Sequence, residues 1–188
     1  MSTVSTNDFK QGMKIEVDNE PYTITNCEFV KPGKGQAFTR TKLKHLMTGR
    51  VLERTFKSGE KFPLADVVEA NMRLLYREGD DAVFMDDNTF DQVTVPLGNL
   101  GDQKKWLKDD IVYALVFYKD SIVDVAPPTF MELVITETAP GARGDTASGR
   151  VLKPAVVETG AEIQVPIFVD EGEKIKVDTR TGEYVSRV

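Results

Sequence analysis

The sequence predicts an all-β protein built from three small barrels, and three observations support this fold class. Short segments of alternating apolar and polar residues recur along the 188 residues, and this alternation is the period of a half-buried strand. Turn-forming residues separate the segments at short intervals, as in small barrels. Two breaks, at residues 58–63 and 126–129, divide the chain. We therefore expect domains at residues 1–64, 65–128 and 129–188.

The first segment reads as a series of short strands. The expected strands lie at residues 13–17, 22–30, 37–47 and 50–56. A turn signal at residues 18–21 joins the first two, because Asp, Asn and Pro favour reversals of the chain. Strands this short and regular predict a small barrel.

The second and third segments are also predicted to be β-rich. In the second, strands are expected at residues 82–86, 91–95, 111–118 and 122–125. A short helix at residues 101–108 is expected among them, with Asp102 as its cap and Trp106 turned inward. This combination fits an OB-like barrel. In the third, strands are expected at residues 131–135, 155–157, 162–169, 174–177 and 183–185. Both segments are small for an independent core, so we expect them to pack together.

The stretch at residues 29–38 holds the most informative pattern. Gly33 and Gly35 flank Lys34 and are expected to supply the positive φ of a tight reversal. Pro32 fixes its own φ and keeps Lys31 out of the helical region. The pattern predicts two strands joined by a short loop that holds Lys34 in solvent, either as an RNA contact or merely as a solubilising turn residue.

Three cations follow this loop at alternate positions. Arg40, Lys42 and Lys44 would share one strand face at intervals of about 6.6 Å, near the spacing of phosphates along a nucleic-acid strand. Residues 1–64 carry 11 Lys and Arg against 7 Asp and Glu, although the whole chain has a net charge of −6. The basic segment is therefore the one that carries the loop, which indicates contact with RNA.

The sequence lacks residues that several classes of functional site require. The single histidine, His45, and the single cysteine, Cys27, are too few for a structural zinc site and leave no intramolecular disulfide. No phosphate-binding or dinucleotide-binding glycine motif occurs. The longest apolar run, residues 111–118, is too short to span a membrane, and the N-terminus has no secretory pattern. We expect a cytoplasmic protein without a metal, a cofactor or a catalytic residue, in which His45 is a polar strand residue.

Residues 29–38 resemble the first-domain tip loop of bacterial elongation factor P. In the lysine-type branch of that family, the lysine between the two glycines receives a β-lysyl group and can also be hydroxylated, and Lys34 matches it. A second, distant match at residues 153–172 is similar to the family's third-domain signature, gap for gap. The resemblance covers the whole chain. It implies an SH3-like barrel followed by two OB-like barrels in an elongated L-shape, acting as a monomer.

The resemblance also implies a function and partners. The family's factor binds both ribosomal subunits beside the peptidyl-site tRNA and relieves stalls at consecutive prolines, and a lysyl-tRNA-synthetase paralogue modifies its lysine. The loop at residues 139–149, otherwise best read as a mobile linker, resembles the loop that faces messenger RNA in the exit site. Its matching residues are Gly144, Asp145 and Thr146, whereas residues 150–152 depart from the family's glycine-richer sequence.

Tyr184 and Arg187 match a C-terminal Tyr-x-x-Arg that is implicated in the family's function. Without the resemblance they read as a core tyrosine and a solvated arginine. Two other functions remain open. A general single-strand RNA-binding barrel would need exposed aromatics on its basic face. A hydrolase would need paired carboxylates such as Asp80-Asp81 or Asp86-Asp87, although such doublets in turns are usually solvated charge.

Overall fold

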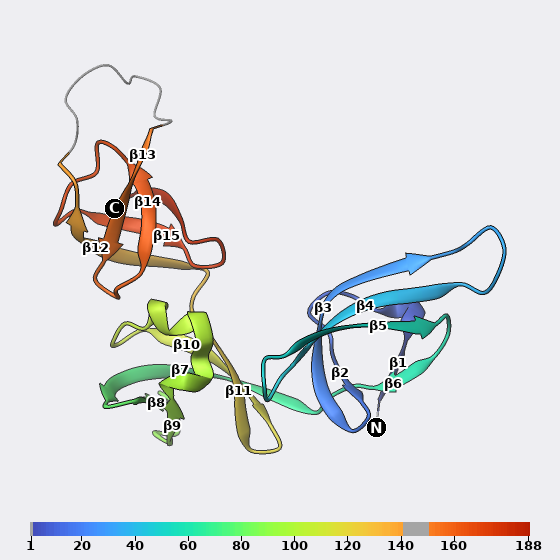
Figure 1. The fold of residues 1–188 in the computed structure, drawn as a ribbon. Helices are drawn as coiled ribbons and strands as arrows, with labels where there is room; N and C mark the ends of the chain where they lie inside the picture. The colour runs from blue at the N-terminus through green and yellow to red at the C-terminus, as the bar shows by residue number, and fades with distance from the viewer. Residues whose placement is uncertain (1, 141–150) are drawn as a thin grey trace. The chain divides into compact units, whose positions relative to one another are not determined.

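The computed structural model describes residues 2–140 and 151–188, and most regular elements in these ranges are β-strands (Figure 1). The strands are β1 Thr3–Ser5, β2 Lys14–Val17, β3 Glu20–Val30, β4 Phe38–His45, β5 Val51–Lys57, β6 Lys61–Pro63, β7 Val67–Glu78, β8 Asp81–Met85, β9 Gln92–Pro96, β10 Val112–Tyr118, β11 Ser121–Ala126, β12 Phe130–Thr138, β13 Leu152–Val157, β14 Glu162–Pro166, β15 Lys174–Asp178 and β16 Glu183–Arg187. Two 3-10 helices, η1 Thr6–Asp8 and η2 Leu97–Trp106, complete the elements of these ranges. The predicted all-β fold class is confirmed.

The chain falls into two compact units. One comprises residues 1–69 and 116–124, and the other comprises residues 70–115 and 125–188. In the first unit, β2, β3, β4 and β5 form an antiparallel sheet in that order, while β1 pairs with β6. An isolated bridge between Ile15 and Leu64 connects the two sheets.

Alternation along the strands of the first unit builds its core. The buried apolar residues of this core are Phe9, Ile15, Val17, Tyr22, Ile24, Leu43 and Phe56. Phe9 meets Phe56 edge to face, with ring centroids 6.2 Å apart. Fully burying an aliphatic or aromatic side chain of this size contributes about 1.5–3 kcal/mol. The core therefore holds the base of β3 and β4 firmly in the sheet.

A second sheet has the strand order β11-β10-β7-β8-β9. The helix predicted at residues 101–108 is replaced by η2, which begins at Leu97 after Pro96 and has no side-chain cap. Asp102 therefore does not cap the element as expected. Gly101 interrupts η2 with φ 54° and ψ −131°, so two short turns form where one helix was predicted. Trp106 does turn inward, as predicted, and is only 2% exposed.

The third region is a closed barrel with the order β12-β13-β14-β16-β15. All pairs are antiparallel except β14 with β16, which is parallel and is recorded at one position, Gln164 with Glu183. The barrel core consists of the inward residues of these strands, among them Leu133, Val165 and Ile175. Trp106 belongs to the same buried cluster, so η2 packs against the barrel.

An ion pair joins the same two regions of the second unit. Lys108 Nζ lies 2.9 Å from Glu158 Oε1 and also donates a hydrogen bond to the Glu132 carbonyl at 3.2 Å. The same carboxylate oxygen accepts the Val134 N–H at 3.0 Å. Burial raises the pKa of Glu158, but the hydrogen bonds from Lys108 and Val134 outweigh it and hold the pKa below its ordinary value.

Candidate functional site

The hairpin of β3 and β4 carries the loop that the sequence indicated. The two strands pair antiparallel, and their last pair, Val30 with Phe38, closes the loop at residues 31–37. The strand expected from residue 37 to 47 is shorter and runs from Phe38 to His45. In Figure 1 this loop extends past the other strands of its sheet. The sheet therefore presents the loop at the end of a long, paired support.

The two glycines beside Lys34 differ in their backbone conformation. Gly35 has φ +111°, a region that side chains strongly disfavour, whereas Gly33 does not take a positive φ. The expectation that both glycines supply positive φ is therefore wrong for Gly33. A Cβ atom at Gly33 would meet nothing within 4 Å. Gly35 shapes the turn, and Gly33 leaves open space beside Lys34.

Lys34 is exposed at the loop apex, and Lys31 is exposed at the start of the loop. Within the part of the chain that the structure describes, neither ammonium group forms an ion pair or a hydrogen bond. Pro32 between them is half-buried. An amine held this way keeps its donors and its charge available for a partner.

The three cations of β4 lie on one face, as the sequence predicts. Arg40, Lys42 and Lys44 are exposed, while the intervening Thr41 and Leu43 are buried. The spacing of the strand therefore sets the basic side chains in a row that leads away from the loop.

Acidic neighbours interrupt this row, which the linear sequence did not indicate. Glu28 on β3 lies opposite Arg40, and Glu53 on β5 lies opposite Lys42. Arg40 approaches both carboxylates, with its Nη1 4.0 Å from Glu28 and its Nε 3.7 Å from Glu53. The charge of Arg40 is therefore partly offset by two carboxylates. Lys42 and Lys44 form no ion pair with any described residue, so their charges remain open. The strand register, which the sequence pattern did not specify, places the acids there.

His45 is a buried structural residue rather than a simple polar strand residue. Its Nε2 lies 2.8 Å from Glu20 Oε2, and its Nδ1 accepts the N–H groups of Met47 and Thr48, each at 3.1 Å. Its ring meets that of Tyr22 edge to face at 4.9 Å. Both ring nitrogens are thus used: Nδ1 holds the turn between β4 and β5, and Nε2 contacts Glu20 at the start of β3.

The carboxylate doublet Asp86-Asp87 shapes a turn. Asp86 accepts the N–H groups of Asn88 and Thr89 at 2.7 and 3.2 Å. Asp87 accepts hydrogen bonds from Arg73, the shortest at 2.7 Å, and this bond lowers the pKa of Asp87. Both groups are occupied by the protein itself, which argues against the hydrolase reading for this doublet.

The C-terminal candidates lie on β16. Tyr184 is half-buried and packs against the barrel core. Arg187 is exposed, donates to the Phe168 carbonyl at 2.7 Å and stacks over the Phe168 ring at 4.7 Å. It also lies 3.5 Å from Glu173. Gly144, Asp145 and Thr146 fall outside the described residues.

The described residues, 2–140 and 151–188, also bear on two other classes of site. No group of three or more His, Cys, Asp or Glu side chains in these ranges is placed to hold a metal ion. No helix in the same ranges is long and apolar enough to cross a membrane.

Three family profiles match successive parts of the chain. They are the elongation factor P KOW-like domain over residues 5–62, the elongation factor P OB domain over residues 67–125, and the elongation factor P C-terminal domain over residues 131–187. Together they cover nearly all of the sequence.

Relatives match along the full length. Elongation factor P 2 of Protochlamydia amoebophila (strain UWE25) is 63% identical over 188 residues, covering 100% of this chain and 99% of the relative. Elongation factor P 2 of Chlamydia pneumoniae is 60% identical with the same coverage. Among solved structures, eukaryotic translation initiation factor 5A from Methanococcus jannaschii aligns with a TM-score of 0.51 at 20% identity, covering 66% of this chain and 95% of that chain. This last likeness concerns the fold alone.

Proposed function

The chain belongs to the elongation factor P family, and from this premise we propose that it binds the ribosome beside the peptidyl-site tRNA and promotes peptide-bond formation at consecutive prolines. The family assigns the chain a role as a translation elongation factor that acts with the ribosome, and its relatives are translation factors rather than classical enzymes. The finer part of the proposal is that a modified Lys34 holds the tRNA 3′ end in place.

The observation that carries the proposal is the state of Lys34. It is exposed at the apex of a paired hairpin, between two glycines, and its ammonium has no partner among the described residues. Without a neighbouring base, nucleophile or metal ligand, an amine of this kind can assist a reaction only by binding and positioning. The catalytic centre must then belong to another molecule.

The length and charge of the modified Lys34 side chain fit an RNA target. A lysine side chain reaches about 6 Å beyond its Cα, and a β-lysyl group on Nζ roughly doubles that reach. The amide bond removes one amine and the added group brings two, so the tip changes from +1 to +2. A longer and more cationic arm can follow the phosphates and bases of a tRNA end. Lys31, Lys42 and Lys44 would add sequence-independent contacts behind it.

Positioning is enough for the reaction that we propose. Proline is a poor acceptor amine with a fixed φ, so the reactants spend little time aligned. Holding the tRNA end still lowers the entropic part of the barrier. A 10- to 100-fold rescue needs only about 1.4–2.7 kcal/mol. A few charge-assisted hydrogen bonds can supply this amount without any acid–base group.

The further partners follow from the same premise. We propose that the factor contacts both ribosomal subunits and that residues 144–146 face messenger RNA in the exit site. A lysyl-tRNA-synthetase paralogue would modify Lys34, for which the open space at Gly33 leaves access. Tyr184 and Arg187 would act through the barrel, because both are held by contacts within it.

The proposal predicts a specific loss on changing Lys34. Lys34→Arg keeps the charge but cannot accept the lysyl group, so the rate at a Pro-Pro reporter should fall at least tenfold while translation of a proline-free reporter is unchanged. Lys31→Arg in the same loop is the matched control and should retain the rescue. Intact-mass measurement of native protein should show one added lysyl unit. Full rescue by Lys34→Arg would contradict the proposed positioning role.

The alternative of a general single-strand RNA-binding barrel has less support. Such a module stacks bases on aromatic side chains of its basic face. Phe29 is 54% exposed on the same hairpin, but it lies opposite the buried Thr39 and therefore on the other face from Arg40. RNA binding without ribosomes should accordingly be weak and indifferent to sequence.

A further inference from the structure

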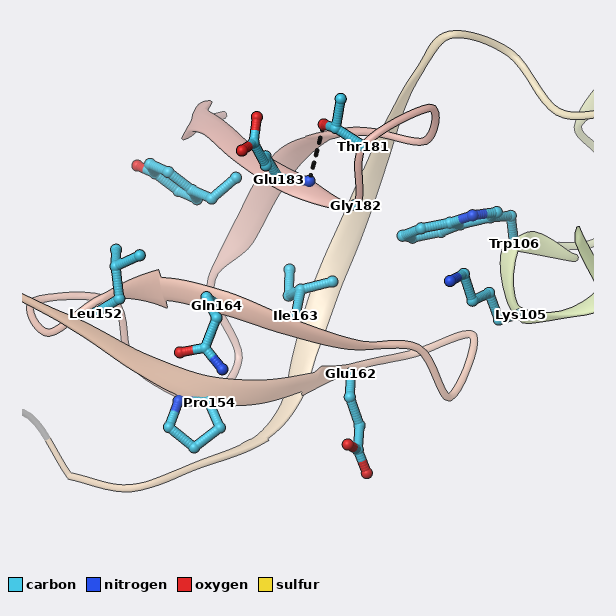
Figure 2. A pocket seen from close by; sticks show the side chains of 11 residues that line it. Lys105, Trp106, Leu152, Pro154, Glu162, Ile163, Gln164, Thr181, Gly182 and Glu183 are labelled. Carbon is cyan, nitrogen blue, oxygen red and sulfur yellow. Dashed lines mark hydrogen bonds between the residues drawn. The ribbon is translucent and has the colours of Figure 1, made fainter. Parts of the chain in front are cut away.

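A cleft of about 630 Å³ lies in the second unit, formed by the closed barrel and η2. Figure 2 shows Leu152 and Pro154 of β13 with Gln164 of β14 along one side, and the segment around Gly182 along the other. Trp106 enters from η2. None of the tip residues takes part, so this cleft is a separate feature from the hairpin loop.

The cleft lies where OB folds ordinarily bind their ligands. Ligands of this fold are held on the second and third strands and by the loops that follow the first and fourth strands. In this barrel the second and third strands are β13 and β14, and the turn after the fourth strand contains Gly182. The position alone therefore predicts a binding surface but not its ligand.

The charges of the cleft point to a cationic ligand. Two carboxylates, Glu162 and Glu183, line it, and both are exposed without an ion pair to any described residue. The one lining cation, Lys105, has its Nζ 5.5 Å from the centre of the Trp106 ring. A lining of two negative charges against one positive charge disfavours a phosphate backbone and favours lysine or arginine.

The backbone and the apolar residues point to a peptide rather than a small cation. β14 and β16 pair at only one position, Gln164 with Glu183. The other residues of these two strands are not paired with each other. An extended segment can lie in the cleft along these two strands and place alternate side chains against its lining. Leu152 is 52% exposed there, and Tyr184 also lines the cleft, so apolar contact surface is available.

We propose that this cleft binds an extended, lysine- or arginine-bearing segment of another protein. The inference does not depend on the modification of Lys34 or on its contact with tRNA. It assigns the barrel a protein partner in addition to the RNA that the tip would meet.

The single tryptophan of the chain, Trp106, lines the cleft and reports on its occupancy. The full-length protein is titrated with a short peptide of alternating lysine and threonine, and its emission is followed. We expect a saturable change that weakens as salt is raised. A matched peptide of alternating glutamate and threonine and a short uridine oligonucleotide should give none.

Charge variants locate the binding. Glu162→Gln with Glu183→Gln should weaken the lysine peptide about tenfold, since two exposed ion pairs are lost. Glu78→Gln with Glu132→Gln removes the same charge from β7 and β12, outside the cleft, and should leave affinity unchanged. The proposal is overturned if no saturable change occurs, if both double variants weaken binding equally, or if the oligonucleotide binds as tightly as the lysine peptide.

Discussion

The two ends of the β3–β4 hairpin hold their polar side chains in opposite ways. At one end, His45 uses both ring nitrogens, contacting Glu20 and two backbone N–H groups of the following turn. At the other end, Lys34 has no partner among the described residues. The first end is stabilised by its contacts, while the second relies on the register of the strands to hold a loop that forms few contacts itself. The contacts of a side chain therefore distinguish residues that stabilise the hairpin from residues that are free to bind a partner.

The largest effect that tests this comparison is expected at the His45 end. His45→Ala would leave two N–H groups without an acceptor and open a cavity beside Tyr22, so the free energy of unfolding should fall by about 2–3 kcal/mol. Chemical denaturation measures this change. Lys44→Ala, the exposed neighbour on the same strand, should change stability by less than about 0.5 kcal/mol. Equal losses in the two variants would remove the contrast between the hairpin ends.

An intermediate effect is expected within the tip loop itself. Gly35→Ala forces a side chain to φ +111°, and we expect it to lower the free energy of unfolding by about 1–2 kcal/mol. Gly33→Ala meets open space at an ordinary φ and should be neutral within about 0.5 kcal/mol. Thermal unfolding, together with amide exchange at the closing pair Val30 and Phe38, would compare the two. A similar destabilisation by both would show that Gly33 also carries a backbone constraint.

The same contrast shows which features the sequence could predict. Alternation predicted that Arg40, Lys42 and Lys44 share one strand face, and turn chemistry placed Lys34 at a loop apex. The pattern could not show that Glu28 and Glu53 flank the basic row, because that depends on the register between strands. The pattern also did not predict that both ring nitrogens of His45 form hydrogen bonds. A turn whose backbone N–H groups bind a side chain leaves no periodic signal in the sequence. At Gly101 the local backbone gave two short turns, so the helix capped by Asp102 did not form.

The cleft beside Trp106 is a further feature that sequence reasoning missed. Its lining comes from residues about 80 positions apart, from Lys105 to Tyr184, and they meet because the barrel closes and η2 packs against it. The prediction that Trp106 turns inward was correct, but it carried no information about which strands it would meet. A sequence pattern predicts whether a side chain is buried better than it predicts which residues that side chain contacts.

The smallest effect separates paired from unpaired cations on β4. Arg40 approaches Glu28 and Glu53, whereas Lys42 forms no ion pair with a described residue. If this face meets phosphates, Lys42→Gln should weaken ribosome binding about two- to threefold and reduce its salt dependence by roughly one charge. Arg40→Gln should have less effect, because its charge is already partly offset by two carboxylates. Co-sedimentation with ribosomes over a range of salt concentrations measures both variants. A greater loss from Arg40→Gln would mean that its acidic neighbours orient the guanidinium toward RNA, and the distinction between paired and free cations would then fail on this strand.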